Sequence, residues 1–194
     1  LWAADQCKGE GVSIHENTAV EKVDENGNLW INGNAKQFDR IINIAGPWAE
    51  SLLKASNITS NYELDLVRGA HIVIEGEMAH GYLLEVSHED RIFFVLPYHG
   101  QTLIGTTEVR QEINEPIEPS NDEINYLIRA YNHYFEIQIA TTDIVEKFAG
   151  VRPLIKSSID PNNATREYEI ESHGKLITVF GGKWTTTRQL GKKV

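Results

Sequence analysis

Runs rich in β-branched and aromatic residues follow one another through the middle of the chain, with short polar turns between them. They occupy residues 66–74, 82–86, 91–97 and 101–107. Such runs are typical of strands, and short polar turns favour antiparallel neighbours. The middle of the chain is therefore predicted to form an antiparallel sheet.

A helix is predicted to cover this sheet. Ser120 and Glu123 have the spacing of a capping box, in which each side chain satisfies a backbone N–H at a helix start. Apolar residues then recur at the spacing of one helix face, namely Ile124, Leu127, Ile128, Tyr131 and Phe135. Further strands are expected around residues 144–151, 167–170 and 176–180.

The two ends of the chain have the pattern of α/β structure. Strands are expected at residues 12–14, 19–23 and 29–31, the last two joined by a turn that contains Asn26-Gly27. A strand over residues 38–45 then leads into Gly46-Pro47 and a short helix that ends near residue 54. The predicted fold class is α+β, an antiparallel sheet covered by helices and flanked by partial α/β elements.

Composition excludes several classes of protein. The 194 residues carry a net charge of −10, and nucleic-acid binding would need clustered Lys and Arg. No apolar run approaches the roughly 20 residues that a membrane helix requires. The single cysteine, Cys7, rules out an internal disulfide. The seven histidines have no metal-binding spacing, so no metal site is predicted.

Near the C-terminus an apolar strand runs into Gly181-Gly182 and then into a predicted helix. Glycines let another molecule approach the backbone closely, and a helix N-terminus presents unpaired N–H groups. The turn is therefore suited to an anionic or electron-rich ligand. A Gly-Gly pair between a strand and a helix is also a common tight connection, and the local pattern leaves both interpretations open.

Cationic residues lie beside turns and small residues at Arg152, Arg166 and Lys183. A guanidinium fork matches the geometry of a phosphate or carboxylate, and lysine adds a movable charge. His71 could join this set as a general base or as a phosphate donor. The alternatives are that each arginine pairs with one of the many carboxylates and that His71 is a structural residue.

Taken together, these segments resemble the flavin-dependent glycerol-3-phosphate dehydrogenase family, within the D-amino-acid-oxidase-like flavoproteins. Each motif alone is weak evidence, but they follow the family's order over nearly the whole chain. The motifs are Ile44-Ala45-Gly46-Pro47-Trp48, Arg68-Gly69-Ala70-His71-Ile72-Val73, Leu103-Ile104-Gly105-Thr106-Thr107-Glu108, Gly150-Val151-Arg152-Pro153-Leu154, Thr165-Arg166-Glu167-Tyr168 and Val179-Phe180-Gly181-Gly182-Lys183 with Thr185-Thr186.

The resemblance implies that the full-length protein oxidises sn-glycerol 3-phosphate to dihydroxyacetone phosphate. Hydride would pass from C2 of the substrate to N5 of FAD, and the electrons would pass on to a quinone at the membrane. The protein would then be cytoplasmic and peripheral on the inner face of the cell membrane. A homodimer is left open, because no residue pattern here decides the oligomeric state.

The resemblance also assigns roles to individual residues. Arg152 and Lys183 would act beside the flavin on the glycerol hydroxyls, with His71 as base or phosphate binder. The remaining substrate-binding residues would be Arg166, Thr106 and Arg68. The residues implied to contact FAD are Val20, Ala45, Gly46, Trp48, Gly181, Gly182, Lys183, Trp184, Thr185 and Thr186. The implied division is a partial FAD-binding domain over 1–60, a substrate-binding sheet domain over 61–148 and a return to the FAD-binding domain over 149–194.

The chain departs from the family pattern in two residues and in its extent. Trp184 stands where a smaller apolar residue such as Leu is usual, and Thr187 stands where Tyr is common. The chain starts at Leu1 and has no Gly-x-Gly-x-x-Gly. We therefore expect a fragment of a longer protein that alone binds FAD poorly or not at all and turns over no substrate.

Three other functions compete with this one. An oxidase would use the same fold and substrate but reduce oxygen in place of a quinone. A related flavoenzyme could act on an amine or on a hydroxy acid without phosphate, although the number of cationic residues exceeds what one carboxylate needs. A non-catalytic module could bind a small phosphorylated ligand without redox chemistry.

Overall fold

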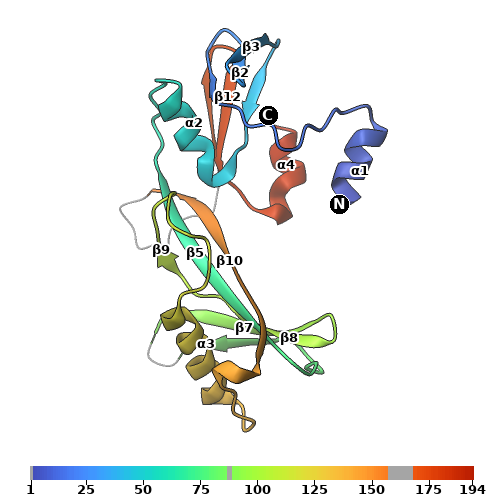
Figure 1. Ribbon diagram of the computed structural model, residues 1–194, viewed down its shortest axis with the longest axis vertical. Coiled ribbons are helices and arrows are strands. Elements are labelled where there is room, and N and C mark those ends of the chain that lie inside the picture. The colour runs from blue at the N-terminus through green and yellow to red at the C-terminus, as the bar shows by residue number, and fades with distance from the viewer. Residues whose placement is uncertain (1, 87–88, 157–167) are drawn as a thin grey trace.

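The computed structural model describes residues 2–86, 89–156 and 168–194. Figure 1 shows an elongated molecule whose upper and lower parts are joined by two long strands, β5 and β10. The helices are α1 (Trp2–Gly9), α2 (Ala49–Ala55), α3 (Asn121–Tyr134) and α4 (Thr187–Gly191), with 3₁₀ turns η1 (Gly46–Trp48), η2 (Thr141–Asp143) and η3 (Trp184–Thr186). None of the helices in these residues is long and apolar enough to cross a membrane.

The lower part is a six-stranded sheet in which every described pairing is antiparallel. Its order is β10-β5-β8-β7-β6, and β9 also pairs with β5. The strands are β5 (Leu64–Ile74), β6 (Tyr82–Glu85), β7 (Ile92–Tyr98), β8 (Gln101–Gly105), β9 (Val109–Arg110) and β10 (Ile144–Ile155). The predicted antiparallel sheet and the α+β class are confirmed.

The upper part contains two small sheets. One is antiparallel, with β1 (Lys22–Val23), β2 (Asn28–Ile31) and β3 (Asn34–Gln37). The other has the order β11-β12-β4, from β11 (Tyr168–His173), β12 (Leu176–Gly181) and β4 (Ile41–Asn43). β12 runs parallel to β4 and antiparallel to β11. The pairing of β12 with β4 joins the C-terminal part of the chain to the N-terminal part.

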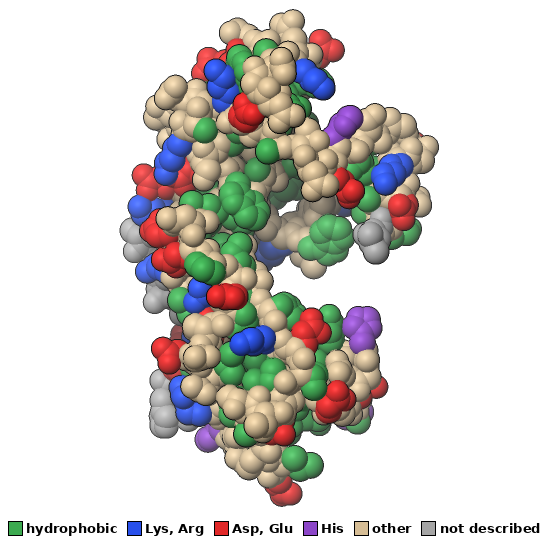
Figure 2. Space-filling model, viewed as in Figure 1, with side chains coloured by type: hydrophobic (Ala, Val, Ile, Leu, Met, Phe, Trp, Pro, Cys, Tyr) green, Lys and Arg blue, Asp and Glu red, His purple; other side chains and the backbone are tan. Residues whose placement is uncertain are grey.

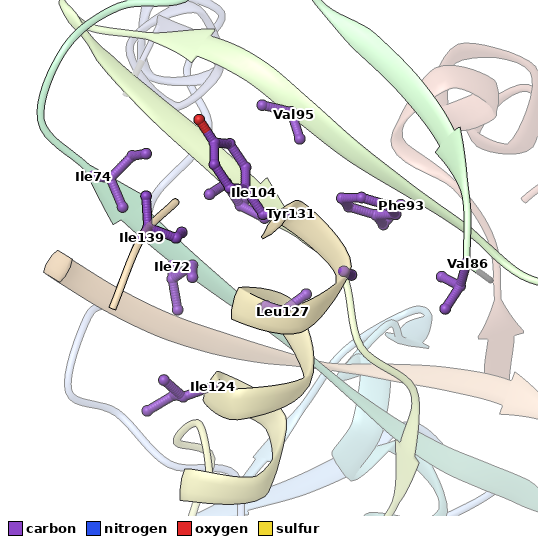
Figure 3. Close-up of a cluster of buried hydrophobic side chains, with 11 residues drawn as sticks. Ile72, Ile74, Val86, Phe93, Val95, Ile104, Ile124, Leu127, Tyr131 and Ile139 are labelled. Carbon is purple, nitrogen blue, oxygen red and sulfur yellow. The ribbon is translucent and has the colours of Figure 1, made fainter. Parts of the chain in front are cut away.

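Helix α3 covers one face of the lower sheet. The predicted capping box is present, because Ser120 accepts from the Glu123 N–H and Glu123 accepts from the Ser120 N–H. Ile124, Leu127 and Tyr131 point from the helix into a cluster with sheet residues such as Ile72 and Phe93, as Figure 3 shows. This apolar contact fixes which face of the sheet is left for other partners.

A second cluster holds the upper part together. Its buried members come from β1, β4, α2 and β12, and they are Val23, Ile41, Leu53, Leu176 and Phe180. Ile155, the last residue of β10, packs on this cluster, while Ile144, its first residue, packs on the α3 cluster. One strand therefore joins both cores and crosses the predicted boundary at 148/149, and the division into domains stays a prediction.

Some predicted elements differ in the structure. Residues 12–14 form no strand, and residues 11–20 are exposed throughout, so the apolar residues there add no buried surface. The strand predicted over 38–45 is limited to Ile41–Asn43, the residues that pair with β12. The helix predicted after Gly182 begins as a 3₁₀ turn and has only the five α-helical residues of α4.

Figure 2 shows a deep notch in the outline between the upper and lower parts. In the same view, α3 and α4 lie on opposite sides of the long strands β5 and β10 (Figure 1). The notch therefore lies on the side of the lower sheet that α3 does not cover.

Leu127 tests the contact between α3 and the sheet. Its side chain is 0% exposed, so Leu127→Ala is expected to lower the free energy of unfolding by about 2–5 kcal/mol through lost burial and a cavity. Arg129→Ala, at an exposed position of the same helix, is the control and should change it by less than about 0.5 kcal/mol. Urea unfolding followed by circular dichroism measures both. Equal effects of the two substitutions would contradict this packing.

Candidate active site

The two faces of β5 carry different chemistry, because side chains alternate along a strand. Ile72 lies in the α3 cluster. His71, one position away, points to the other face, where its ring stacks on Phe148 of β10 with centroids 5.1 Å apart and planes 13° apart. The uncovered face thus presents an imidazole held against an aromatic ring.

The imidazole of His71 is kept in its uncharged form. Burial lowers the pKa of its imidazole below the usual 6.5, and the positive charge of Arg152 lowers this pKa further. Its Nδ1 is buried and has no hydrogen-bond partner among the described residues. At neutral pH the ring is therefore uncharged and can act as a base.

Arg152 lies on the same face and is held by the segment that follows β8. Its Nη1 donates to Oε1 of Glu108 at 2.9 Å. Its Nη2 donates to the carbonyl oxygen of Thr107 at 2.9 Å and to Oγ1 of Thr106 at 3.3 Å. These three bonds use three of the five N–H groups of a guanidinium, so the side chain is fixed and can still donate to a ligand.

A second arginine reaches the same segment from the start of β7. Arg91 donates from Nη2 to the carbonyl oxygen of Thr106 at 3.2 Å, and its Nε lies 3.7 Å from Oε2 of Glu108. It also donates from Nη1 to the hydroxyl of Tyr126 at 3.1 Å. Glu108 thus stands between two guanidinium groups, and it compensates part of their charge.

Two glycines are required beneath these side chains. A Cβ at Gly105, which pairs with His71 across β8 and β5, would overlap the imidazole ring. A Cβ at Gly69 would overlap Nη2 of Arg152 and Oγ1 of Thr106. A side chain at either position would have to displace these groups, and this explains the glycine inside β5 and the glycine at the end of β8.

Arg68 is directed to the opposite face of β5. It donates to Oε2 of Glu123 from Nη2 at 2.8 Å and from Nε at 3.1 Å, and its Nη1 donates to Oε1 of Gln111 at 3.1 Å. The two side chains of this ion pair are only 12% and 4% exposed. The structure therefore does not bring Arg68 together with His71 and Arg152.

The Glu123 carboxylate also collects hydroxyl donors. Thr107 donates to its Oε1 at 2.7 Å, and Ser120 donates to its Oε2 at 2.8 Å. Burial disfavours the charged form, but these bonds and those from Arg68 hold the pKa of Glu123 below its usual value. The carboxylate is therefore ionised and structural at neutral pH.

Three of the residues implied to contact FAD come together in the upper part. Val20, Ala45 and Trp48 line one apolar pocket of about 690 Å³ beside β4 and α2. Gly46 follows with a φ of +57°, and a Cβ there would meet nothing within 4 Å. Large apolar side chains remain uncovered at this pocket, including Ile44 and Trp48.

The other implied FAD contacts form the turn between β12 and α4. Gly181 and Gly182 have φ angles of +70° and +96°, which glycine adopts freely. Lys183 precedes η3, and its side chain is exposed, as is that of Trp184, at 83%. Thr185 and Thr186 follow within η3, and Thr186 donates to the carbonyl oxygen of Lys183 at 3.1 Å.

Arg166 lies outside the described residues, so its predicted role stays a prediction. Within residues 2–86, 89–156 and 168–194, no group of three or more His, Cys, Asp or Glu side chains is placed to hold a metal ion. Glu108 and Arg91 are the residues that sequence reasoning did not assign. Glu108 ends one of the quoted motifs, whereas no sequence pattern linked Arg91 to Arg152.

Comparisons with known proteins identify the family of this chain. The family described as FAD dependent oxidoreductase (DAO) matches residues 1–188. The D-erythritol 1-phosphate dehydrogenase of Brucella abortus is 34% identical in an alignment 203 residues long, and this alignment covers 95% of this chain and 40% of that protein. The aerobic glycerol-3-phosphate dehydrogenase of Escherichia coli is 36% identical over 163 residues, and the match covers 78% of this chain and 32% of that protein.

A solved structure shows the same fold. The glycerol-3-phosphate dehydrogenase from Bacillus halodurans, complexed with FAD, superposes with a TM-score of 0.82 at 22% identity. The match covers 97% of this chain and 39% of that chain. This chain therefore spans about two fifths or less of the length of these relatives.

The contact between His71 and Gly105 can be tested by a double-mutant cycle. Gly105→Ala is expected to cost about 1–3 kcal/mol of unfolding free energy, because the new methyl group must displace the imidazole. In a His71→Ala background the same substitution should cost much less, since the ring is gone. Urea unfolding of the four proteins gives the coupling energy. A coupling near zero would show that the ring does not lie over Gly105.

Proposed function

The chain belongs to the FAD-dependent oxidoreductase family, and from the names of its relatives we propose that the whole protein oxidises a phosphorylated polyol. The first candidate is sn-glycerol 3-phosphate, with dihydroxyacetone phosphate as product. The observation that supports this proposal best is the pairing, on one uncovered sheet face, of an uncharged His71 with a fixed Arg152. A base beside a cation is what removal of a hydroxyl proton needs.

The residues present fit the proposed cofactor. The apolar pocket beside β4 has uncovered aromatic and aliphatic walls, and Gly46 leaves its backbone open to close approach. We propose that Val20, Ala45, Gly46 and Trp48 hold one part of FAD and that the turn from Gly181 to Thr186 meets its ring system. FAD, when bound, accepts the hydride that leaves C2 of the polyol.

In the proposed reaction His71 takes the proton of the C2 hydroxyl, and Arg152 stabilises the negative charge on that oxygen. The C2–H bond breaks, its electron pair leaves with the hydride, and the oxygen lone pair forms the carbonyl. The substrate loses two electrons and two hydrogens, one as the proton on His71. Lys183 is proposed to act at the same hydroxyl groups, and Thr106 and Arg166 to bind the substrate.

A four-carbon substrate is a second candidate. The D-erythritol 1-phosphate dehydrogenase is 34% identical and covers 95% of this chain, and the glycerol-3-phosphate dehydrogenase of Pseudomonas tolaasii is 30% identical and covers 96%. Both names describe oxidation of a polyol monophosphate. The proposed electron acceptor is a quinone, with the protein peripheral on the membrane, and reduction of oxygen is the alternative.

The assay that tests this function uses the whole protein with FAD and a dye acceptor. We expect dye reduction with sn-glycerol 3-phosphate or D-erythritol 1-phosphate and none with glycerol, which lacks the phosphate. Arg152→Lys should lower kcat by about 100-fold, because a lysine cannot reproduce the fixed fork. Arg110→Lys is the matched control, since Arg110 forms an exposed pair with Asp65, and it should leave the rate unchanged.

The pH dependence of the same assay tests the role of His71. Because the pKa of His71 is lowered from 6.5, kcat/KM should rise with pH through a midpoint below pH 6.5 and then reach a plateau. Oxygen uptake in place of quinone reduction would select the oxidase. Oxidation of neither polyol phosphate by the wild type would contradict the proposal, and the 194-residue chain alone is expected to bind FAD weakly and to be inactive.

A further inference from the structure

Gly150 lies on the uncovered sheet face between the two site residues of β10. It pairs with Gly69, while Phe148 pairs with His71 and Arg152 with Val67. Side chains at alternate positions of a strand share a face. A side chain at 150 would therefore project between the ring of Phe148 and the guanidinium of Arg152.

Gly150 differs from the other two glycines of this face. Gly69 and Gly105 exclude a Cβ because Arg152, Thr106 and His71 fill the space above them. A Cβ at Gly150 would meet nothing within 4 Å among the described residues, and Gly150 is exposed. The part of the chain that the structure describes therefore gives no packing reason for a glycine at this position.

The backbone of Gly150 gives no reason either. Its φ does not lie in the left-handed region that favours glycine. A glycine inside a strand weakens that strand, because it gains conformational freedom in the unfolded chain and has no side chain to pack. A glycine inside a strand often marks a bulge, a tight bend or a place where a ligand or another backbone approaches closely. The register of β10 with β5 is regular at Gly150, which leaves close approach as the reason.

We propose that Gly150 is a specificity-determining residue that forms the floor of the substrate-binding pocket beside Arg152. This inference rests on the proposed oxidation of a polyol phosphate. The carbon chain of the substrate lies across the Cα of Gly150, with its hydroxyl oxygen toward Arg152 and His71 and with the ring of Phe148 as a wall. Any side chain at 150 occupies volume that the substrate needs.

Gly150→Ala in the whole protein tests this inference, because the added methyl group should hinder substrate binding without disturbing the fold. The thermal midpoint should stay unchanged or rise. KM for whichever polyol phosphate the wild type oxidises should rise at least about tenfold, since one methyl group in a fitted pocket has an effect of this size. Gly150→Val should raise KM further. Calorimetry with dihydroxyacetone phosphate, which is not oxidised, should show the same loss of affinity.

Gly9→Ala is the matched control, because a Cβ at Gly9 in α1 also meets nothing within 4 Å, and it should change neither KM nor affinity. Unchanged KM and product affinity in Gly150→Ala, with an active wild type, would overturn this inference and leave the proposed function standing. A wild type that oxidises neither polyol phosphate would overturn the proposed function and this inference together.

Discussion

The lower half of the molecule depends on the buried carboxylate of Glu123. It accepts hydrogen bonds from Arg68 of β5, from Ser120 at the start of α3 and from Thr107 after β8. Removing one partner from a buried pair leaves an uncompensated charge, which costs far more than the loss of an exposed pair. Helix, central strand and the segment after β8 are therefore fixed to one another at a single group.

Thr107 transmits this constraint to the other face of the sheet. Its hydroxyl donates to Glu123 and accepts from the Ala70 N–H at 2.8 Å, while its carbonyl oxygen accepts from Arg152 at 2.9 Å. Thr107 thus belongs both to the buried hydrogen-bond network around Glu123 and to the segment whose acceptors fix the guanidinium of Arg152. The site is preorganised because its cation is bonded to a segment that the core already holds.

Local patterns were sufficient for much of the fold. The capping box at Ser120, the apolar face from Ile124 to Tyr131 and the antiparallel runs were all readable, because each depends on residues close in sequence. The strand expected at residues 12–14 was wrong, since an apolar run forms a strand only where a partner edge exists. Whether such an edge exists depends on residues far away in the sequence, which a short local pattern does not include.

The candidate site could be predicted from the sequence only in part, for a similar reason. His71 and Arg152 were found from their motifs, but Arg68 was grouped with them although an odd number of positions separates it from His71 in one strand. The alternation of a strand places such residues on opposite faces. Glu108 reaches Arg152 through the pairing of β10, β5 and β8, and Arg91 reaches Glu108 through the pairing of β7 with β8, a register that no single segment shows.

Thr107→Val in the whole protein tests most directly whether the core sets the position of Arg152. Valine keeps the shape of threonine but has no hydroxyl, so the bonds to Glu123 and from Ala70 are lost. The account predicts a loss of about 1–3 kcal/mol in unfolding free energy, together with a higher KM and a lower kcat in the folded enzyme at 25 °C. A loss of stability with unchanged KM and kcat would contradict it, because the two faces of the sheet would then be independent.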